Sequence, residues 1–544
     1  MVRMRDGVRL ATDVYLPDGD CSPGPVLLTR LPYDKSGAFT PIALFAEYFI
    51  ARGYRVVAQD VRGKFRSEGE RQILVHEADD GYDTIDWISR QQWCNGDVAM
   101  WGNSYYGFTQ LAAMTTQHPA LKAIAPRLTG TQLGQPRLAS STDVTRRVEW
   151  AETYLYPLSF FHDNDNLFWS VDWQTRPYLA SIEAFIAANG GSSRSFDQWY
   201  PRAHPLPVYR SVAHPFDARA IPTLYTIGWW DNCAPWSWHD VEAMSERAAW
   251  RDALHIVIEP IDHYSHELGD PNAVEYPTVD QWRARIPRIL GPSADFFDVY
   301  LRGVKDIRLP RVRYTVARAG DQGRGDLRES DVWPPVGEEV RLVATQDSAL
   351  VLERTGTVPS TSQESTRQWI HDPDDLVPTP APNPFKSILD PGDTERASRH
   401  PGVLSFRSEP LLEDVEIVGK VQAGGCFRST GPSMDVFVRL MDVDETGARF
   451  RIARGDIHIV DSTSETSVEI TMDYAGYLVR AGHHLEVELA SSDFPEFVPL
   501  PGTGADPWAA VETALNTQRV LVGGRRGFSV TMTTTQSIRE GDST

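Results

Sequence analysis

Short apolar runs alternate with stretches of helical periodicity in the first part of the chain. Strand-like runs occupy residues 8–15, 25–30, 54–59 and 98–101, where apolar residues alternate with polar ones or follow one another directly. Helical spacing of apolar side chains covers residues 42–52 and 76–91, and the second stretch carries acidic residues on its early turns. Strands that alternate with helices predict a parallel α/β sheet.

An aromatic-rich segment with weak periodicity, residues 143–217, interrupts this pattern. We interpret it as an inserted helical cap. Strand-like runs return at residues 222–227 and 254–258, each followed by a loop and helix-like sequence. The sequence therefore predicts one sheet domain in two parts, residues 1–142 and 218–309, with the cap between them.

The pattern changes again after residue 309. Residues 310–544 contain short runs of Val, Ile, Thr and Leu separated by Gly, Pro and Asp, most clearly at 415–421, 434–441, 468–472 and 485–489. This spacing predicts an antiparallel β-sandwich. Residues 358–393 are rich in proline, and we expect them to form a long irregular segment.

Composition excludes several classes of protein. The chain has 544 residues, of which 41% are hydrophobic, and 74 acidic against 53 basic residues give a net charge of −21. Without clustered Lys and Arg, such a chain is not expected to bind nucleic acid. No stretch approaches the roughly 20 apolar residues that span a bilayer, and residues 1–20 contain no apolar signal-peptide core. We therefore expect no membrane segment and a cytoplasmic location.

The four cysteines do not suggest a metal site. Cys21, Cys94, Cys233 and Cys426 lie far apart in the sequence and show no metal-ligand spacing. We expect neither a zinc site nor a disulfide scaffold, although this spacing leaves a single disulfide open.

The sequence GNSYYG at residues 102–107 is similar to a nucleophile elbow. An apolar run precedes it and a helix-compatible run follows it, as expected where a serine sits at a strained strand-to-helix turn. The usual pattern is G-x-S-x-G, but here Gly107 follows Ser104 by three positions. Ser104 is the candidate nucleophile, and an ordinary strand-to-helix turn is the alternative.

A serine nucleophile needs a histidine base and a carboxylate that orients the histidine. In α/β-hydrolases these partners follow the serine in the order acid, then histidine, after later strands. Asp231 follows the run at 222–227, and His263 follows the run at 254–258. Asp231 is also interpretable as a helix N-cap. The residues that spacing leaves open are Asp240 and Asp252 for the acid, and His239, His255 and His266 for the base.

Motifs along nearly the whole chain resemble the cocaine-esterase-like (CocE/NonD) serine hydrolases, relatives of X-prolyl dipeptidyl peptidases and α-amino acid ester hydrolases. The resemblance rests on MRDGVRL at 4–10, LPYDK at 31–35, DVRG at 60–63, GNSYYG at 102–107, GWWD at 228–231, FDVYLRG at 297–303, WPP at 333–335, LSFRSEPL at 404–411 and SSDFP at 491–495. It implies an α/β-hydrolase domain with an inserted helical cap, followed by a C-terminal all-β jelly-roll domain.

The resemblance also assigns roles to residues. It implies Ser104 as nucleophile, Asp231 as acid and His263 as base, the last within a segment where the family has G-P-W-x-H. Glu259 and Ile261 depart from that family segment. The family's oxyanion hole corresponds to the backbone N–H of Tyr105 and the hydroxyl of Tyr33.

The substrate is less constrained by the sequence. Relatives that select a free α-amino group place acidic residues soon after the triad aspartate, where this chain has Asn232 and Cys233. This difference disfavours amino-acid esters. Trp230, and Trp169 in the predicted cap, are candidate contacts for an apolar or aromatic group, although aromatic clusters more often serve packing alone.

We therefore expect a serine esterase that cleaves a small-molecule ester, or an amide, through an acyl-enzyme without a metal or organic cofactor. One alternative is an acyltransferase or transesterase that uses the same acyl-enzyme. A second is a non-catalytic binding protein, because a fold does not fix a function. The sequence leaves open whether the chain forms a homo-oligomer.

Overall fold

The computed structural model describes residues 1–19, 22–133, 171–194, 197, 208–264, 277–320, 325–353, 364–381, 385–388, 391–536 and 538. These residues fall into two compact units. The first takes in the described residues up to 133 and those from 191 to 313. The second takes in residues 171–190 and the described residues from 314 onward.

The first unit alternates strands and helices along the chain. Its strands are β1 (Val2–Arg3), β2 (Arg9–Leu10), β3 (Thr12–Tyr15), β4 (Gly24–Leu31), β5 (Arg55–Asp60), β6 (Cys94–Asn103), β7 (Leu121–Arg127), β8 (Thr223–Gly228) and β9 (Leu254–Glu259). Its helices are α1 (Ile42–Ile50), α2 (Glu77–Ser89), α3 (Ser104–Met114), η3 (Pro215–Asp217), α6 (Ala234–Ser245), α7 (Ala248–Ala253) and α8 (Val279–Arg302).

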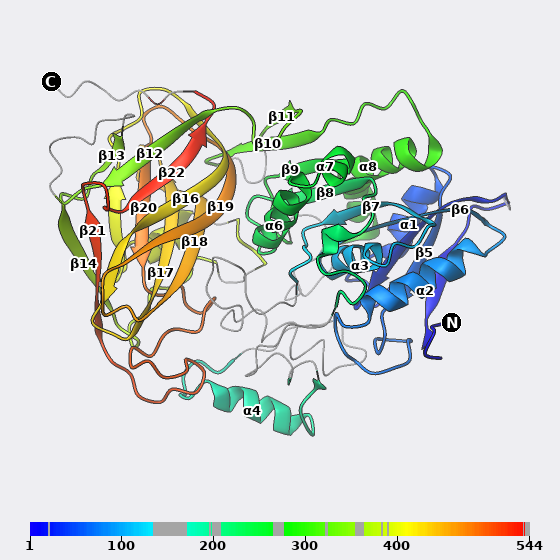
Figure 1. Ribbon diagram of the computed structural model, residues 1–544, viewed down its shortest axis with the longest axis horizontal. Helices are drawn as coiled ribbons and strands as arrows, with labels where there is room; N and C mark the ends of the chain where they lie inside the picture. The colour runs from blue at the N-terminus through cyan, green and yellow to red at the C-terminus, as the bar shows by residue number, and fades with distance from the viewer. Residues whose placement is uncertain are drawn as a thin grey trace. The chain divides into compact units, whose positions relative to one another are not determined.

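The main sheet of this unit is parallel except at one edge. Its strands lie in the order β3–β5–β4–β6–β7–β8–β9, and only β3 runs antiparallel to its neighbour. Helices α2 and α3 pack together against β4 and β6, while α1 packs on α8 and on β5 (Figure 1). Because helices cover the sheet, every residue of β5 and β8 is buried. The predicted parallel α/β sheet is confirmed.

The predicted strand at residues 8–15 is wrong as one element. The chain forms β2, which pairs with β1, and then β3, which pairs with β5. Ala11 separates them, because its N–H donates to the Ser67 hydroxyl (2.8 Å) and its carbonyl accepts the Asp60 N–H (3.1 Å). A long-range side-chain contact therefore divides a locally continuous pattern.

The second unit is mostly β-structure. Its strands are β10 (Val312–Arg318), β11 (Asp326–Ser330), β12 (Glu338–Ala344), β13 (Leu350–Glu353), β14 (Ser365–His371), β15 (Leu404–Arg407), β16 (Val415–Ser429), β17 (Ser433–Val443), β18 (Arg449–Val460), β19 (Thr466–Val479), β20 (His484–Ala490), β21 (Asn516–Val522) and β22 (Ser529–Thr534); β10 begins in the first unit. Its helices are α4 (Leu179–Ala188) and α9 (Pro391–Ser398).

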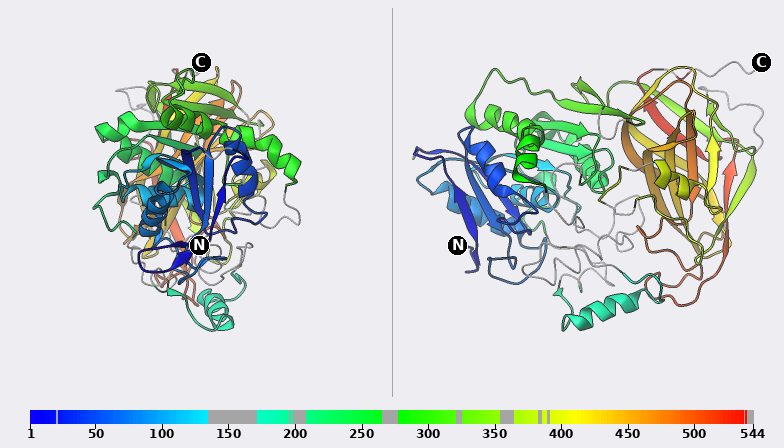
Figure 2. Two further views of the ribbon diagram at one scale, coloured as in Figure 1. Left: turned by 90° about the vertical axis from the view of Figure 1, so that its right-hand side faces the viewer. Right: turned by 180° about the vertical axis from the view of Figure 1, so that it is seen from behind.

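Two groups of mainly antiparallel strands build this unit, and its strands are visible in the right-hand view of Figure 2. In one group β16 pairs with β19, β21 and β22. Strand β22 also pairs with β12, and β21 with β14. In the other, β17 pairs with β18 and β20, and β20 pairs with β15. The predicted C-terminal all-β domain is confirmed.

The proline-rich segment is only partly irregular. Our prediction for residues 358–393 is wrong at β14, which pairs along its whole length with β21. The sequence of β14, STRQWIH, contains no proline, so all of its N–H groups remain available for pairing. Prolines on either side do not prevent a strand between them.

The predicted cap, residues 143–217, is described only in part, at residues 171–194, 197 and 208–217. Residues 143–170 lie outside the described residues, and residues 171–190 belong to the second unit. There Trp173 stacks on Trp508 with ring centroids 6.1 Å apart, and the Leu179 N–H donates to the Trp508 carbonyl (2.8 Å). The start of α4 is thus attached to the all-β unit. Among the described residues, no helix is both long and apolar enough to cross a membrane.

Candidate active site

The candidate nucleophile lies at a sharp turn between β6 and α3. Strand β6 ends at Asn103 and α3 begins at Ser104, so no loop residue separates them. Ser104 is buried and has a φ of 52°, a left-handed conformation that costs a non-glycine residue on the order of 1–3 kcal/mol. Backbone strain at this position is what a nucleophile elbow requires.

Two glycines make this turn sterically feasible. Gly102 has a φ of 135°, and a Cβ placed there would lie 2.0 Å from the ring of Tyr106. A Cβ on Gly107 would lie 2.7 Å from the Thr129 side chain. The Thr129 side chain thus approaches the backbone closely at position 107. This close approach explains why the second glycine follows Ser104 by three positions.

The residue after Ser104 is anchored by its side chain. The Tyr105 hydroxyl accepts a hydrogen bond from the Leu74 N–H (2.7 Å) and donates one to Glu77 Oε1 (2.9 Å). Glu77 is paired with the fully buried Arg30, whose Nη1 lies 2.9 Å from Glu77 Oε2. Burial raises the pKa of both Tyr105 and Glu77. The sequence patterns did not identify Glu77, because Tyr105 and Glu77 lie on different helices.

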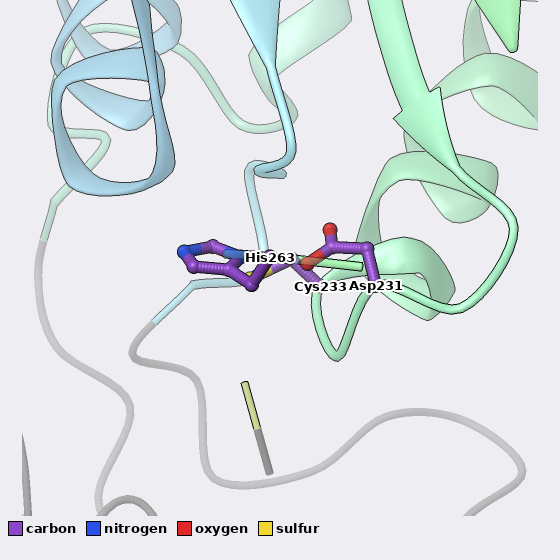
Figure 3. Close-up of side chains that lie close together, drawn as sticks. All are labelled: Asp231, Cys233 and His263. Carbon is purple, nitrogen blue, oxygen red and sulfur yellow. Dashed lines mark hydrogen bonds and ion pairs between the residues drawn. The ribbon is translucent and has the colours of Figure 1, made fainter. Parts of the chain in front are cut away.

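The candidate acid and base are in contact. Asp231 follows β8, His263 follows β9, and His263 Nδ1 lies 2.6 Å from Asp231 Oδ1 (Figure 3). Both side chains are buried. Asp231 Oδ2 is also buried and accepts no hydrogen bond from the described part of the chain.

Backbone hydrogen bonds hold the two loops together beyond the strand ends. The Trp229 N–H donates to the Glu259 carbonyl (3.0 Å), and the Trp230 N–H donates to the Ile261 carbonyl (3.1 Å). These bonds continue the pairing of β8 with β9 and bring Asp231 opposite His263. The backbone therefore holds the two loops side by side, and the side chains of Asp231 and His263 meet between them.

Glu259 has a charge partner at the same edge of the sheet. Its Oε2 lies 2.9 Å from Nη2 of Arg127, the last residue of β7, so this ion pair crosses β8. Arg127 is itself in register with Asn103, the residue before Ser104. Glu259 departs from the family segment, and its charge is compensated by an ion pair with the buried Arg127.

Tyr33 also lies at this edge. It follows β4, which is the parallel neighbour of β6, and its side chain is buried. Its ring contacts Phe39 and Tyr106 edge-on, with centroids 5.2 Å and 6.3 Å away. Tyr33 and Ser104 thus follow the carboxyl ends of adjacent strands.

Other candidates for the acid and base make different contacts. Asp240 accepts hydrogen bonds from the Thr131 N–H (2.7 Å) and the Tyr225 hydroxyl (2.8 Å), and burial raises its pKa to about 7. His255 lies 2.9 Å from the Pro310 carbonyl and 2.9 Å from the Tyr300 hydroxyl. His266 and Trp169 lie outside the described residues, and Trp230 is half-buried beside Asp231.

A cysteine lies next to the candidate acid and base. One ligand-type atom from each of Asp231, Cys233 and His263 lies within 4.8 Å of the other two (Figure 3). Among the described residues this is the one group of three side chains so placed that could ligate a metal. No disulfide joins the described cysteines Cys94, Cys233 and Cys426. Spacing in the sequence missed this group because its members lie on two loops.

Sequence comparison relates the chain to known hydrolases. The pattern of the X-Pro dipeptidyl-peptidase (S15) family matches residues 6–265, and that of the X-Pro dipeptidyl-peptidase C-terminal non-catalytic domain matches residues 305–531. The cocaine esterase of Rhodococcus sp. is 29% identical over 93% of this chain and 92% of its own length. A Mycobacterium bovis protein named "Putative serine esterase Mb1866c" is 40% identical over 92% of this chain and 91% of its own.

The chain belongs to the cocaine-esterase-like (CocE/NonD) hydrolases. Two solved structures share the fold of this family member. An aminopeptidase from a marine sediment Thaumarchaeota archaeon has a TM-score of 0.77 at 22% identity, covering 98% of this chain and 96% of its own. An α-amino acid ester hydrolase has a TM-score of 0.73 at 23% identity, covering 99% and 96%. This cocaine-esterase-like protein is a serine ester hydrolase with an α/β-hydrolase core and a C-terminal all-β domain.

Proposed function

We propose that Ser104, His263 and Asp231 cleave a carboxylic ester through an acyl-enzyme. The observation that supports this proposal most strongly is the buried contact of 2.6 Å between His263 Nδ1 and Asp231 Oδ1. The strained Ser104 follows a parallel strand of the same sheet, so all three side chains lie at the carboxyl ends of strands.

The chemistry follows from the hydrogen bond between acid and base. An ionised carboxylate only accepts hydrogen bonds, so the proton of neutral His263 belongs on Nδ1, leaving Nε2 to accept a proton. Ser104 Oγ attacks the ester carbonyl while its proton passes to Nε2. Nε2 then returns this proton to the departing alcohol, and a water molecule hydrolyses the acyl-enzyme by the same steps.

Two donors are proposed to stabilise the oxyanion of the tetrahedral intermediate. They are the Tyr105 N–H, at the start of α3, and the Tyr33 hydroxyl, after β4. Loss of one such donor typically costs about 3–4 kcal/mol of transition-state stabilisation. The anchored side chain of Tyr105 supports this role, because it restricts movement of the peptide that carries the N–H.

The proposed substrates are small-molecule esters, with some amides, that carry an apolar or aromatic group. This class is suggested by the cocaine esterase, whose name identifies its substrate, and by the half-buried Trp230 beside Asp231. Trp169 is the second proposed contact. Indole rings would bind such a group through their large apolar faces.

A fluorophosphonate probe and a p-nitrophenyl ester test the nucleophile. We expect Ser104→Ala to lose both the covalent label and ester turnover, because the proposed reaction takes its attacking oxygen from Ser104. Ser237→Ala is a matched control, since Ser237 is also buried but donates its hydroxyl proton to the Thr129 carbonyl. Labelling that persists in Ser104→Ala would contradict the proposal.

Separate alanine variants test the base. His263→Ala should abolish turnover, and His266→Ala should retain it. The opposite result would assign the base to His266. Intact-mass measurement after mixing with a panel of esters and amides would identify the acyl group held on Ser104.

A further inference from the structure

A thiol lies beside the proposed acid and base, and the proposed reaction does not use it. Ligand-type atoms of Asp231, Cys233 and His263 lie within 4.8 Å of one another, and all three side chains are buried. We propose that these three side chains bind Zn²⁺ and that the bound ion inhibits the enzyme. Only the inhibition rests on the proposed function; the binding does not.

The three donors suit this ion. Zinc in proteins is bound by imidazole nitrogen, thiolate sulfur and carboxylate oxygen at about 2.0–2.3 Å, usually in tetrahedral geometry. Two donors bound to one such ion are therefore separated by roughly 3.3–3.8 Å. His263 Nδ1 and Asp231 Oδ1, now 2.6 Å apart, would need to separate by only about 1 Å. The Cys233 sulfur already lies within 4.8 Å of a ligand-type atom of Asp231 and of His263.

Charge favours the bound ion in this buried place. One carboxylate and one thiolate together neutralise Zn²⁺, and a neutral imidazole adds no charge. The loaded site therefore avoids the large cost of burying an uncompensated charge. Cys233 directly precedes α6, and the N-terminal end of a helix stabilises the thiolate.

Zinc binding would remove the base whichever ring nitrogen it occupies. On Nε2 the ion would directly replace the serine proton. On Nδ1 it would leave the single imidazole proton on Nε2, which could then no longer accept one from Ser104. The proton balance is simple: the Cys233 thiol releases one proton to solvent, and His263 keeps the one it has.

The sulfur should also make the site selective. Thiolate is a soft ligand that favours Zn²⁺ and Co²⁺ over Mg²⁺ and Ca²⁺, which prefer oxygen. Inhibition by Zn²⁺ with no effect of Mg²⁺ is therefore expected.

Cobalt spectroscopy tests binding without using activity. Co²⁺ added to Ser104→Ala should give the near-ultraviolet charge-transfer band of a cobalt–thiolate bond. The band should disappear in Ser104→Ala with Cys233→Ser and remain in Ser104→Ala with Cys426→Ser. Cys426 is a matched control, because its buried thiol lies 4.0 Å from the Glu465 carboxylate but belongs to no group of three possible ligands among the described residues. Melting curves in EDTA show whether each variant is folded.

Inhibition is measured on the enzyme with Ser104 intact. Cys233→Ser replaces a soft thiolate with a neutral hydroxyl, so the half-inhibitory Zn²⁺ concentration should rise roughly tenfold or more. EDTA should restore turnover of the parent enzyme. Cys233→Ala is the second variant and should behave like Cys233→Ser.

The outcomes separate the two proposals. Absence of a thiolate band in Ser104→Ala, or a band that survives Cys233→Ser, overturns the metal site. Equal inhibition of the parent enzyme and Cys233→Ser overturns the inhibitory role. If Ser104→Ala retains turnover but its cobalt band depends on Cys233, the proposed nucleophile is wrong and the metal site stands.

Discussion

The Tyr105 hydroxyl donates a hydrogen bond of 2.9 Å to the buried carboxylate of Glu77. It thereby connects the residue after the proposed nucleophile to α2, where Arg30 holds Glu77 in place through an ion pair of 2.9 Å. The backbone of Tyr105 is thus restrained by its neighbours in the turn and also by the hydrogen bond of its side chain to Glu77.

Removal of the Tyr105 hydroxyl should slow the chemical step. In Tyr105→Phe the backbone N–H proposed for the oxyanion hole loses the anchor that its own side chain provides, so we expect kcat to fall roughly tenfold with little change in KM. The free energy of unfolding should fall by about 1–3 kcal/mol, because Glu77 loses a buried partner. Steady-state kinetics and urea denaturation measure the two effects.

Tyr54→Phe is the control for that experiment. It also removes a buried hydroxyl that donates to a carboxylate, Asp298 Oδ1, at 2.8 Å. A similar loss of stability with unchanged kcat is expected. Equal losses of kcat in both variants would mean that Tyr105 contributes only to stability.

Asp231→Asn should disable catalysis while leaving the fold intact. An amide in contact with Nδ1 can favour the wrong histidine tautomer, and the analogous change in serine proteases lowers kcat by about 10⁴. We expect a loss of roughly 10³–10⁴-fold in kcat for p-nitrophenyl ester turnover. Turnover within tenfold of the parent enzyme would refute the assignment of Asp231 as the acid.

Asp240 should make stability depend on pH. Burial raises its pKa from 3.8 to about 7 in the folded protein. The folded state therefore holds this proton at pH values where the unfolded chain has released it, and stability falls as pH rises from about 4 to 7. Asp240→Asn can keep the bonds to Thr131 and Tyr225 without this cost, so it should gain up to on the order of 4 kcal/mol relative to the parent over this range.

Urea denaturation of both proteins at several pH values tests that prediction. The difference in unfolding free energy should grow as the pH is raised from about 4 to 7 and level off above 7. Asp252→Asn, at an exposed carboxylate, is the control and should follow the parent. A constant difference between Asp240→Asn and the parent from pH 4 to 8 would disprove the effect.

Gly102→Ala should lower the stability of the protein far more than Gly96→Ala, which also replaces a glycine of positive φ. A Cβ at Gly102 would lie 2.0 Å from the Tyr106 ring, whereas a Cβ at Gly96 would meet nothing within 4 Å. Both glycines have positive φ, 135° and 96°. We expect Gly96→Ala to cost about 1 kcal/mol and Gly102→Ala more than about 3 kcal/mol, with loss of probe labelling. Thermal denaturation and fluorophosphonate labelling would distinguish the two variants.

The sequence alone determined the local features of this protein. The apolar run, two glycines and helical run around Ser104 predicted its strand-to-helix turn, and strand patterns placed Asp231 and His263 after β8 and β9. The same patterns located the α/β core and the all-β domain. These features could be predicted because they depend on backbone preferences and on side chains a few residues apart.

Only the tertiary structure decided which distant groups meet. In the fold, His263 contacts Asp231, while Asp240 accepts hydrogen bonds from Thr131 and Tyr225. Glu259 forms an ion pair with Arg127 across β8. The tertiary structure also brought Glu77 into contact with the Tyr105 hydroxyl and placed Cys233 beside Asp231 and His263. Such contacts depend on the order of strands in the sheet and on the paths of loops, which long-range pairing sets and no local periodicity encodes.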